Sequence, residues 1–225
     1  MGTLFVVGTP IGNLEDLTPR AARVLGEVSL VAAEDTRRTR ALLTHLGLRK
    51  PLVAVYGDVE RSRAQQVVEA LEGGEVAYCT DGGMPVVSDP GAHLVDQVRA
   101  AGHEVVVIPG PSAVTTALAG SGFSGDRFVF GGFLPRKSSE MTRVFEALAD
   151  DRRTFVAYES AQRLLKTLDI ISATLPDRRC AVARELTKVH EEIRVGRAAE
   201  LADRYRAKPP KGEITILVEG VSRKK

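Results

Sequence analysis

The sequence predicts an α/β protein with two lobes. Up to about residue 115, apolar runs of strand length alternate with segments of helical spacing. This alternation is typical of a mostly parallel sheet with helices on both faces. The runs are continuously apolar, as expected for strands that are covered on both faces. The second half is less regular and contains a candidate hairpin, which predicts a mixed α+β lobe.

In the first half we expect five strands, each an apolar run that ends at a turn signal. These runs cover residues 4–7, 29–33, 52–55, 76–79 and 104–108. Thr18 and Asp35 are expected to cap the helices after the first two strands, because their side chains can accept hydrogen bonds from the first free backbone N–H groups. Gly47 and the Gly73–Gly74 pair are expected to end helices.

In the second half we expect strands at residues 127–133, 154–158 and 213–218, and a hairpin of residues 180–183 and 191–195. Helical spacing is found around Met141–Leu148 and Leu164–Ile171. The segment Ser121–Gly125 is the expected boundary. The predicted domains are therefore residues 1–120 and 121–220, with a frayed tail at 221–225.

Composition indicates an ordinary globular protein. The 225 residues are 44% hydrophobic and 27% charged, with a net charge of +2, which does not by itself indicate nucleic-acid binding. Cys79 and Cys180 lie in apolar runs and are expected to be buried free thiols. The cysteine and histidine spacing predicts no metal site. We see no signal peptide and no run long enough to span a bilayer, so a cytoplasmic location is expected.

The stretch Asp81–Gly91 is the most informative part of the chain. It joins the apolar run Val76–Cys79 to a helical segment and contains three glycines, two prolines and two aspartates. In open α/β sheets, ligands bind at the carboxyl ends of the strands. Three more loops follow strands in the same half: Gly8–Asn13, Glu34–Arg38 and Pro109–Ala113.

The first of these loops disfavours two common ligand classes, dinucleotides and nucleoside phosphates bound by a P-loop. Gly8–Asn13 is not a GxGxxG dinucleotide fingerprint and lacks the lysine of a P-loop, so a ligand with few phosphates is favoured. Plainer interpretations remain open, since Asp35 and Ser112 can simply cap helices and Asp81–Gly91 can be a breaker-rich turn.

Eight segments occur in the order found in one family. They are Leu4–Asn13, Glu34–Arg40, Asp81–Gly91, Pro109–Ala113, Gly132–Lys137, Tyr158–Ser160, Arg184–Lys188 and Lys211–Glu213. Over about residues 3–220, the chain resembles the tetrapyrrole-methylase-like methyltransferases that use S-adenosylmethionine. It is most similar to the branch that methylates the ribose 2′-hydroxyl of a cytidine in 16S ribosomal RNA.

The resemblance implies a two-lobed fold with S-adenosyl-L-methionine held between an N-terminal and a C-terminal lobe. The resemblance indicates which loops bind the cofactor more directly than it indicates the role of each side chain. The residues that it implies for binding the cofactor are Pro10, Asp81, Gly82, Met84, Ser112, Ala113, Tyr158, Leu186, Gly212 and Glu213. It also implies a homodimer that acts on 16S rRNA or the small ribosomal subunit.

Methyl transfer also requires catalytic groups besides those that bind the cofactor. Methyl transfer to a hydroxyl requires alignment and the loss of a proton, so a carboxylate or lysine near the hydroxyl can act as a base. Lys188, Glu185 and Glu34 are the catalytic candidates, and each has a salt-bridge role as its alternative. Arg37, Arg38, Arg136 and Lys137 are candidate RNA phosphate contacts, with solvated surface charges as the alternative.

Two other functions stay open at this point. The first keeps the methyl donor but changes the acceptor to a tetrapyrrole or another small molecule. The second is a binding module, either a donor sensor or a ribosome-assembly factor, that kept the fold and lost catalysis. The chain departs from the family pattern at three places: Tyr56–Arg61 lacks the usual histidine-rich segment, Gly83–Met84 replaces Ala and Thr, and the sequence stops at Lys225, where relatives often continue into a small helical domain. The first and third departures bear on the RNA target more than on the methyl donor, and the first sustains the binding module.

Overall fold

The computed structural model describes residues 1–57 and 60–221. The chain divides into two compact units, Met1–Ser112 and Ala113–Lys225. Asp58 and Val59, which belong to the Tyr56–Arg61 segment, lie outside the described residues, as does the tail from 222 to 225.

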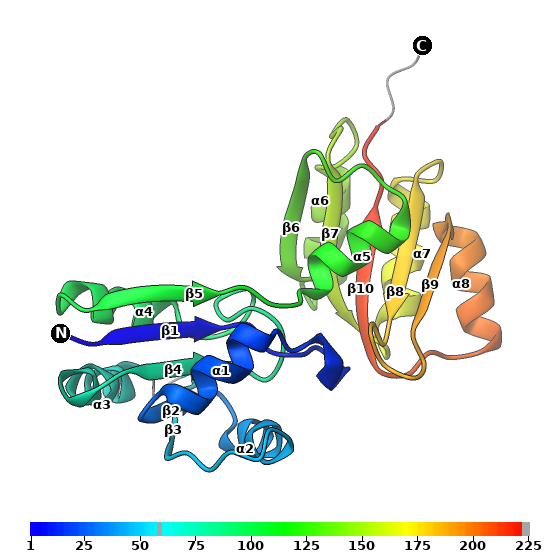
Figure 1. The fold of residues 1–225 in the computed structure, drawn as a ribbon. Coiled ribbons are helices and arrows are strands. Elements are labelled where there is room, and N and C mark those ends of the chain that lie inside the picture. Colours follow the sequence, from blue (N-terminus) through cyan, green and yellow to red (C-terminus); the bar gives the residue numbers. More distant parts are fainter. Residues whose placement is uncertain (58–59, 222–225) are drawn as a thin grey trace. The chain divides into compact units, whose positions relative to one another are not determined.

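The first unit contains one five-stranded sheet, in which every neighbouring pair of strands is parallel. The strand order is β3-β2-β4-β1-β5 (Figure 1). The parallel sheet predicted from the sequence is thus confirmed. Its elements are β1 (Thr3–Val7), the 3-10 helix η1 (Leu14–Asp16), α1 (Pro19–Glu27), β2 (Leu30–Ala33), α2 (Thr36–His45), β3 (Leu52–Ala54), α3 (Glu60–Gly73), β4 (Val76–Cys79), α4 (Ala92–Ala100) and β5 (Glu104–Ile108).

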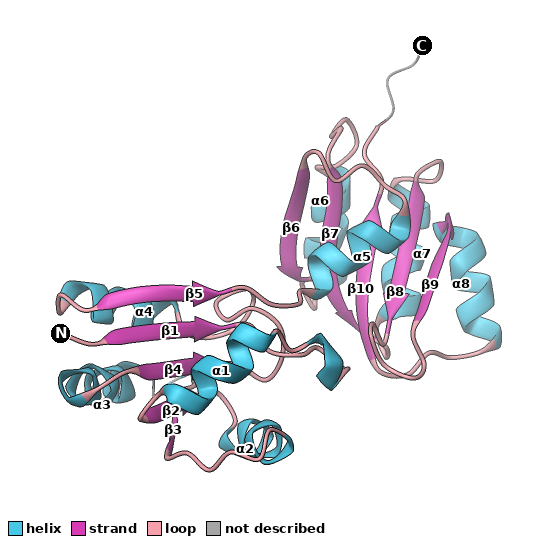
Figure 2. Cartoon of the chain, viewed as in Figure 1, coloured by secondary structure: helices cyan, strands magenta, loops and turns pink. Residues whose placement is uncertain are grey.

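Helices cover both faces of this sheet (Figure 2). Helices α1 and α2 pack on one face and α3 and α4 on the other. Successive side chains of a strand point to opposite faces. Accordingly, Val6 of β1 packs with α3 and α4, whereas Val7 packs with α1 and α2. This two-sided burial explains why the strands are continuously apolar.

Both predicted helix caps are present. The Thr18 hydroxyl accepts a hydrogen bond from the Ala21 N–H at 3.1 Å, and the Asp35 carboxylate accepts one from the Arg37 N–H at 2.8 Å. Each cap satisfies a backbone donor that the helix leaves unpaired. Together they fix where α1 and α2 begin after the loops that precede them.

The second unit contains a mixed sheet with the order β6-β7-β10-β8-β9. Strands β6 and β7 are parallel, and the other neighbours are antiparallel. The predicted hairpin is confirmed as β8–β9. The elements are α5 (Ala113–Ser121), β6 (Phe128–Phe133), α6 (Ser138–Glu146), β7 (Thr154–Ser160), α7 (Leu164–Thr174), β8 (Arg179–Arg184), β9 (Glu192–Arg197), α8 (Ala198–Ala207) and β10 (Glu213–Val218).

Helices α6, α7 and α8 build the core of the second unit on one face of its sheet. Helix α5 contacts β10, β9 and β8, and Figure 1 shows it across the opposite face. These contacts make α5 part of the second compact unit, which begins at Ala113, whereas the sequence places the expected domain boundary at Ser121–Gly125. Helix α8 was not predicted, although Ala198, Leu201, Ala202 and Tyr205 have helical spacing and are buried.

The two cysteines lie in different sheets, Cys79 in β4 and Cys180 in β8, and both are buried free thiols. Burial raises the pKa of each thiol to about 12, so neither is a ready nucleophile. Across residues 1–57 and 60–221, no helix has both the length and the apolar character needed to cross a membrane.

Gly91 gives a test of how the Asp81–Gly91 loop is held on the core. Its φ is 122°, and a Cβ at this position would collide with the ring of the fully buried Tyr78. We expect Gly91→Ala to lower the free energy of unfolding by about 2–4 kcal/mol, from backbone strain and overpacking together. Urea unfolding of the full chain measures this change.

Gly102→Ala is the matched control. Gly102 also has a positive φ, 83°, but nothing lies within 4 Å of the added Cβ. It should cost about 1–2 kcal/mol, from backbone strain alone. Equal losses for the two variants would contradict the proposed collision with Tyr78.

Candidate functional site

Four loops meet at the carboxyl edge of the parallel sheet, as the sequence predicted. Two of them, after β1 and β4, are joined by backbone alone: Thr9 and Gly83 exchange N–H···O hydrogen bonds of 2.9 Å in both directions. The Thr9 hydroxyl also donates to the Thr80 carbonyl at 3.3 Å. The first residues of both loops therefore have fixed positions.

The loop after β5 is held against the other two by close backbone approach. A Cβ on Gly8 would lie 2.7 Å from Gly110 Cα, and a Cβ on Gly110 would lie 2.8 Å from the Gly8 carbonyl carbon. The Gly110 N–H points to the Met84 sulfur at 3.3 Å. The Met84 side chain therefore contacts the loops themselves, and its backbone is the part left for a ligand.

The edge also gathers carboxylates. The Asp81 N–H donates to Glu34 Oε2 at 3.2 Å, and Arg38 Nε lies 3.4 Å from Asp81 Oδ2. Burial raises the pKa of Glu34, and the charges of Asp81 and Asp89 add to this effect. Burial also raises the pKa of Asp89. A cationic group is therefore favoured here over an anionic one.

Asp35 and Arg37, by contrast, act on each other. Arg37 Nη2 lies 2.7 Å from Asp35 Oδ2, and the Arg37 side chain is 85% exposed. Hydrogen bonds from Arg37 lower the pKa of Asp35 to about 2. Asp35 thus has the helix-capping role that the sequence left open. The structure separates the neighbouring arginines, because Arg38 contacts Asp81 whereas Arg37 does not.

A cavity of about 260 Å³ opens at this edge. This volume is close to the lower end of the roughly 300–1,000 Å³ found for ligand pockets. It is lined by Thr9, Pro10, Leu14, Arg38, Thr39, Ala41, Leu42, Thr80 and Asp81. The cavity brings together Pro10 and Asp81, predicted for the cofactor, with Arg38, predicted for RNA.

The α2 residues of this lining were missed in the sequence. Thr39 and Leu42 are three positions apart on α2, and Leu42 is also a core residue. Neither residue lies in a loop, so the sequence offers no signal that distinguishes them from ordinary helix packing. Gly82 lies beside the loop after β1, since a Cβ on Gly82 would be 3.0 Å from the Pro10 carbonyl oxygen.

The loop after β4 is held in an unusual backbone conformation. Val86 and Ser88 have φ values of 76° and 62°. A β-branched residue at positive φ is rare, because its side chain crowds the backbone. Such strain is concentrated at functional sites. The strain therefore makes the Asp81–Gly91 loop a candidate functional loop.

The second unit has its own set of predicted site residues, all near one edge of its sheet. Strands β6, β7 and β8 end at this edge and β10 begins there: Ser160 pairs with Glu213, and Arg184 pairs with Ile214. Tyr158 and Leu186 lie at this edge, Leu186 being only 6% exposed. Ser112 ends the first unit and Ala113 begins α5 of the second.

Lys188, Glu185 and Glu213 form one ion-pair network. Lys188 Nζ lies 3.0 Å from Glu185 Oε1 and 2.7 Å from Glu213 Oε2, and Glu185 Oε1 also accepts from the Glu213 N–H at 3.0 Å. A side chain at Gly212 would collide with the Glu185 carboxylate. The network links the segment after β8 to the start of β10.

The pKa directions in this network oppose proton abstraction. Hydrogen bonds to Glu213 and Glu185 raise the pKa of Lys188 despite the opposing effect of burial. The Glu213 N–H, together with Lys188, lowers the pKa of Glu185. A base should have a pKa near the working pH. The pKa shifts of Lys188 and Glu185 lead away from the working pH, whereas the raised pKa of Glu34 leads towards it.

Arg136 and Lys137 follow β6 in an exposed turn. Lys137 Nζ lies 3.2 Å from Glu140 Oε1, and both side chains are well exposed. Within the described residues, no group of three or more His, Cys, Asp or Glu side chains is arranged to hold a metal ion.

Comparison with known proteins gives close sequence relatives. The chain is 46% identical to the ribosomal RNA small subunit methyltransferase I of Thermotoga maritima, over 98% of this chain and 99% of that protein. It is also 46% identical to the protein of the same name from Pseudomonas aeruginosa, over 97% of this chain and 79% of that protein.

Solved structures share the fold at lower identity. A diphthine synthase matches with a TM-score of 0.75 at 14% identity, over 97% of this chain and 90% of that one. The uroporphyrin-III-C-methyltransferase of Thermus thermophilus matches with a TM-score of 0.66 at 24% identity, over 96% and 94%. These likenesses support the fold alone.

A family match covers most of the chain: residues 3–202 match the tetrapyrrole (corrin/porphyrin) methylases. The order of motifs, the parallel sheet and the mixed second sheet agree with this match. The chain therefore belongs to the tetrapyrrole methylase family of S-adenosylmethionine-dependent methyltransferases.

Proposed function

We propose that this protein transfers a methyl group from S-adenosylmethionine to the ribose 2′-hydroxyl of a cytidine in 16S ribosomal RNA. The observation that carries the proposal is the 46% identity to a ribosomal RNA small subunit methyltransferase over nearly the full length of both proteins. We further propose that it acts as a cytoplasmic homodimer on rRNA or on the small ribosomal subunit.

The loops of the first unit fit the cofactor. The bound cofactor supplies a methyl group on a positively charged sulfur, which makes the methyl open to attack. Glu34, Asp81 and Asp89 provide the negative charge that favours such a cation. Gly8, Gly82 and Gly110 leave backbone in place of side chains at the loops. Pro10, Gly82 and Met84 would contact it through backbone, and Asp81 through its carboxylate.

Residues of the second unit that we propose for cofactor binding are Tyr158, Leu186, Gly212 and Glu213, with Ser112 and Ala113 at the junction of the units. Of the three candidate bases, we favour Glu34. Its carboxylate combines partial burial with a raised pKa, so it can take up a proton at a less acidic pH than an ordinary glutamate. Lys188 and Glu185 then have a structural role as an ion pair.

A tetrapyrrole acceptor has weaker support. The uroporphyrin methyltransferase resembles this chain at 24% identity, which bears on the fold and not on the acceptor. The relatives at 46% identity carry the name of an RNA enzyme. The cationic candidates Arg38, Arg136 and Lys137 also suit a polyanion.

The acceptor can be tested directly. Small ribosomal subunits from a strain without this activity, incubated with the enzyme and methyl-labelled donor, should gain label in 16S rRNA. The label should be recovered in an alkali-resistant dinucleotide, because 2′-O-methylation blocks cleavage of the adjacent phosphodiester. Label found only in a tetrapyrrole would overturn the acceptor. A lack of donor binding at millimolar concentration would reject every donor-dependent function.

Asp81→Ala tests the cofactor loop. Loss of a hydrogen bond to a charged group should weaken donor binding by about tenfold or more, as measured by calorimetry. Asp96→Ala, on the exposed surface of α4, is the control and should bind as the wild type does. If Asp81→Ala keeps full affinity, the donor does not bind at this loop.

Glu34→Gln tests the base. The base form is the carboxylate, so the wild-type kcat should rise with pH as Glu34 loses its proton, with a midpoint above its ordinary pKa of 4.5. Glutamine can still accept from the Asp81 N–H but cannot take up a proton. The variant should lose about a hundredfold or more in kcat together with this pH dependence.

The exposed Glu27→Gln serves as control for the loss of one negative charge. A full kcat in Glu34→Gln would exclude Glu34 and leave Glu185 and Lys188 as the candidates. Donor affinity, measured in parallel, separates a loss of chemistry from a loss of binding.

A further inference from the structure

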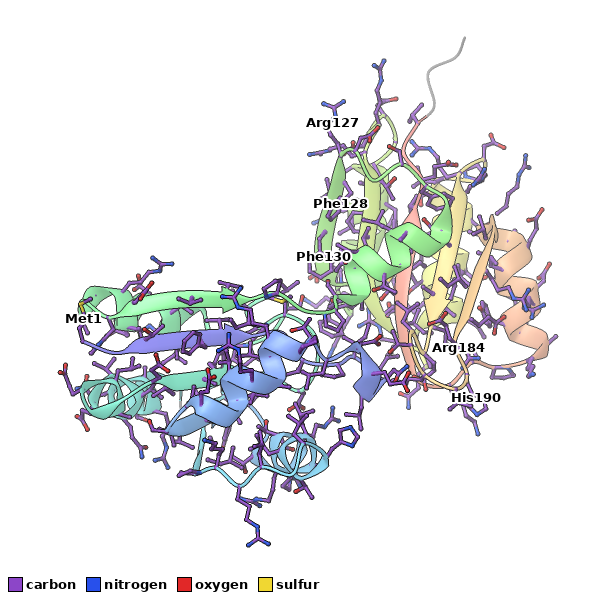
Figure 3. The ribbon with its side chains drawn as sticks, in the orientation of Figure 1. Met1, Arg127, Phe128, Phe130, Arg184 and His190 are labelled. Carbon is purple, nitrogen blue, oxygen red and sulfur yellow. The ribbon has the colours of Figure 1, made fainter. Side chains whose placement is uncertain are left out.

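Strand β6 leaves aromatic side chains exposed. Within residues 1–57 and 60–221 it is an edge strand that pairs only with β7, and the main contacts of α5 are with β10, β9, β8 and β7. Three of the chain's seven phenylalanines lie on it. Phe128 is 39% exposed and Phe133 is 68% exposed. Figure 3 shows Phe128 and Phe130 along this strand.

Phe133 is exposed but not loose. Its ring centre lies 5.3 Å from that of Tyr158, with the rings at 62°, and Phe130 packs on the same tyrosine at 5.0 Å. The pairing of β6 with β7 shifts register between Phe130 and Phe133. The shift places Phe133 opposite Tyr158, which supports one edge of its ring.

The turn that follows is braced from inside. Arg163 Nη2 donates to the carbonyls of Leu134 and Pro135, at 3.0 and 2.6 Å. Its Nε lies 3.2 Å from the carboxylate of Glu159, which is only 4% exposed. Glu159 also accepts from the Thr167 hydroxyl at 2.7 Å. Arg163 therefore fixes the backbone from which the next residues project.

Those next residues are cations. Residues 127–139 include Arg127, Arg136 and Lys137 and no Asp or Glu. Among the residues that the structure describes, Arg136 is exposed and forms no ion pair. The pair of Lys137 with Glu140 is exposed, and such pairs contribute little, so a phosphate can replace the carboxylate.

We propose that the turn Phe133–Lys137 binds single-stranded RNA, with Phe133 stacked on an unpaired base and Arg136 and Lys137 on the flanking phosphates. The proposal rests on the proposed function and specifies its substrate as unpaired rather than duplex RNA. An aromatic face can stack only on a base that is not already stacked within a helix. The cations supply the attraction to the backbone.

Charge favours RNA over a second copy of the chain. In a two-fold dimer the same patch meets itself, so Arg136 and Lys137 would face their own counterparts without an acidic residue in the segment. Like charges placed together across an interface oppose association. A polyanion satisfies both the cations and the aromatic ring.

The test uses the full-length protein and a labelled single-stranded RNA oligonucleotide that contains cytidine, with a blunt RNA duplex of equal length for comparison. Fluorescence anisotropy should give tighter binding of the single strand. Phe133→Ala should weaken it about tenfold without changing the salt dependence. Arg136→Gln should also weaken it and should reduce the slope of log K against log salt by about 0.7.

Phe128→Ala is the matched control, because Phe128 is an exposed phenylalanine on the same strand outside the turn. It should bind RNA as the wild type does. Circular dichroism and thermal unfolding should show that all three variants are folded, a check that does not depend on Tyr158, which Phe133 contacts and which we propose for the donor. The kcat/KM for small ribosomal subunits should fall about tenfold in Phe133→Ala and stay unchanged in Phe128→Ala.

Three results would overturn the proposal: wild-type RNA affinity in Phe133→Ala, equal losses in Phe133→Ala and Phe128→Ala, or a change of oligomeric state in Phe133→Ala by sedimentation velocity. Wild-type protein that binds neither RNA would overturn it as well. Methylation of small ribosomal subunits by the wild type distinguishes a failure of this inference from a failure of the proposed function. If methylation occurs and Phe133→Ala is fully active, only the inference fails; if 16S rRNA is never labelled, the proposed function fails.

Discussion

The pair of reciprocal hydrogen bonds between Thr9 and Gly83 is the constraint on which the first unit's site depends. It ties together the loops after β1 and β4, and the contact of Gly8 with Gly110 adds the loop after β5. These contacts involve backbone atoms, so they hold the loops in place without occupying the space that a ligand needs. Pro10 and Asp81 line the same cavity, and the Asp81 N–H donates to Glu34. Preorganisation of this kind lowers the cost of ordering when a ligand binds.

The sequence predicted the first unit well because its signals are local. Continuous apolar runs identify buried strands, and Thr18 and Asp35 identify helix starts within a few residues. Features that join distant segments were not predictable in this way. The Lys188–Glu213 pair spans 25 residues and the Asp81–Glu34 contact spans 47. A single sequence shows that charged residues occupy these positions but does not show which residues they contact in the folded chain.

The two units differ in the charge that they present. In the first, burial together with the charge of Asp81 raises the pKa of Glu34 and of Asp89 at the loop edge. In the second, residues 127–139 carry only positive charge. A net charge of +2 conceals this contrast, which is why composition gave no indication of a nucleic-acid partner. This local charge separation is consistent with the proposal that the chain binds a cationic cofactor and a polyanionic acceptor through different elements.

The segment after β8 contains two residues in an unfavourable backbone conformation. Glu185 and Thr187 have φ values of 51° and 64° on either side of the buried Leu186. Neither residue is suited to that backbone region, and the ion pairs of Glu185 help to hold it there. An engineer who sought heat resistance would replace Thr187 by asparagine or glycine, which adopt this conformation more easily. Glycine at this position would also remove a side chain beside Leu186, which we propose for cofactor binding, so gains in thermal tolerance and retention of the proposed binding would compete there.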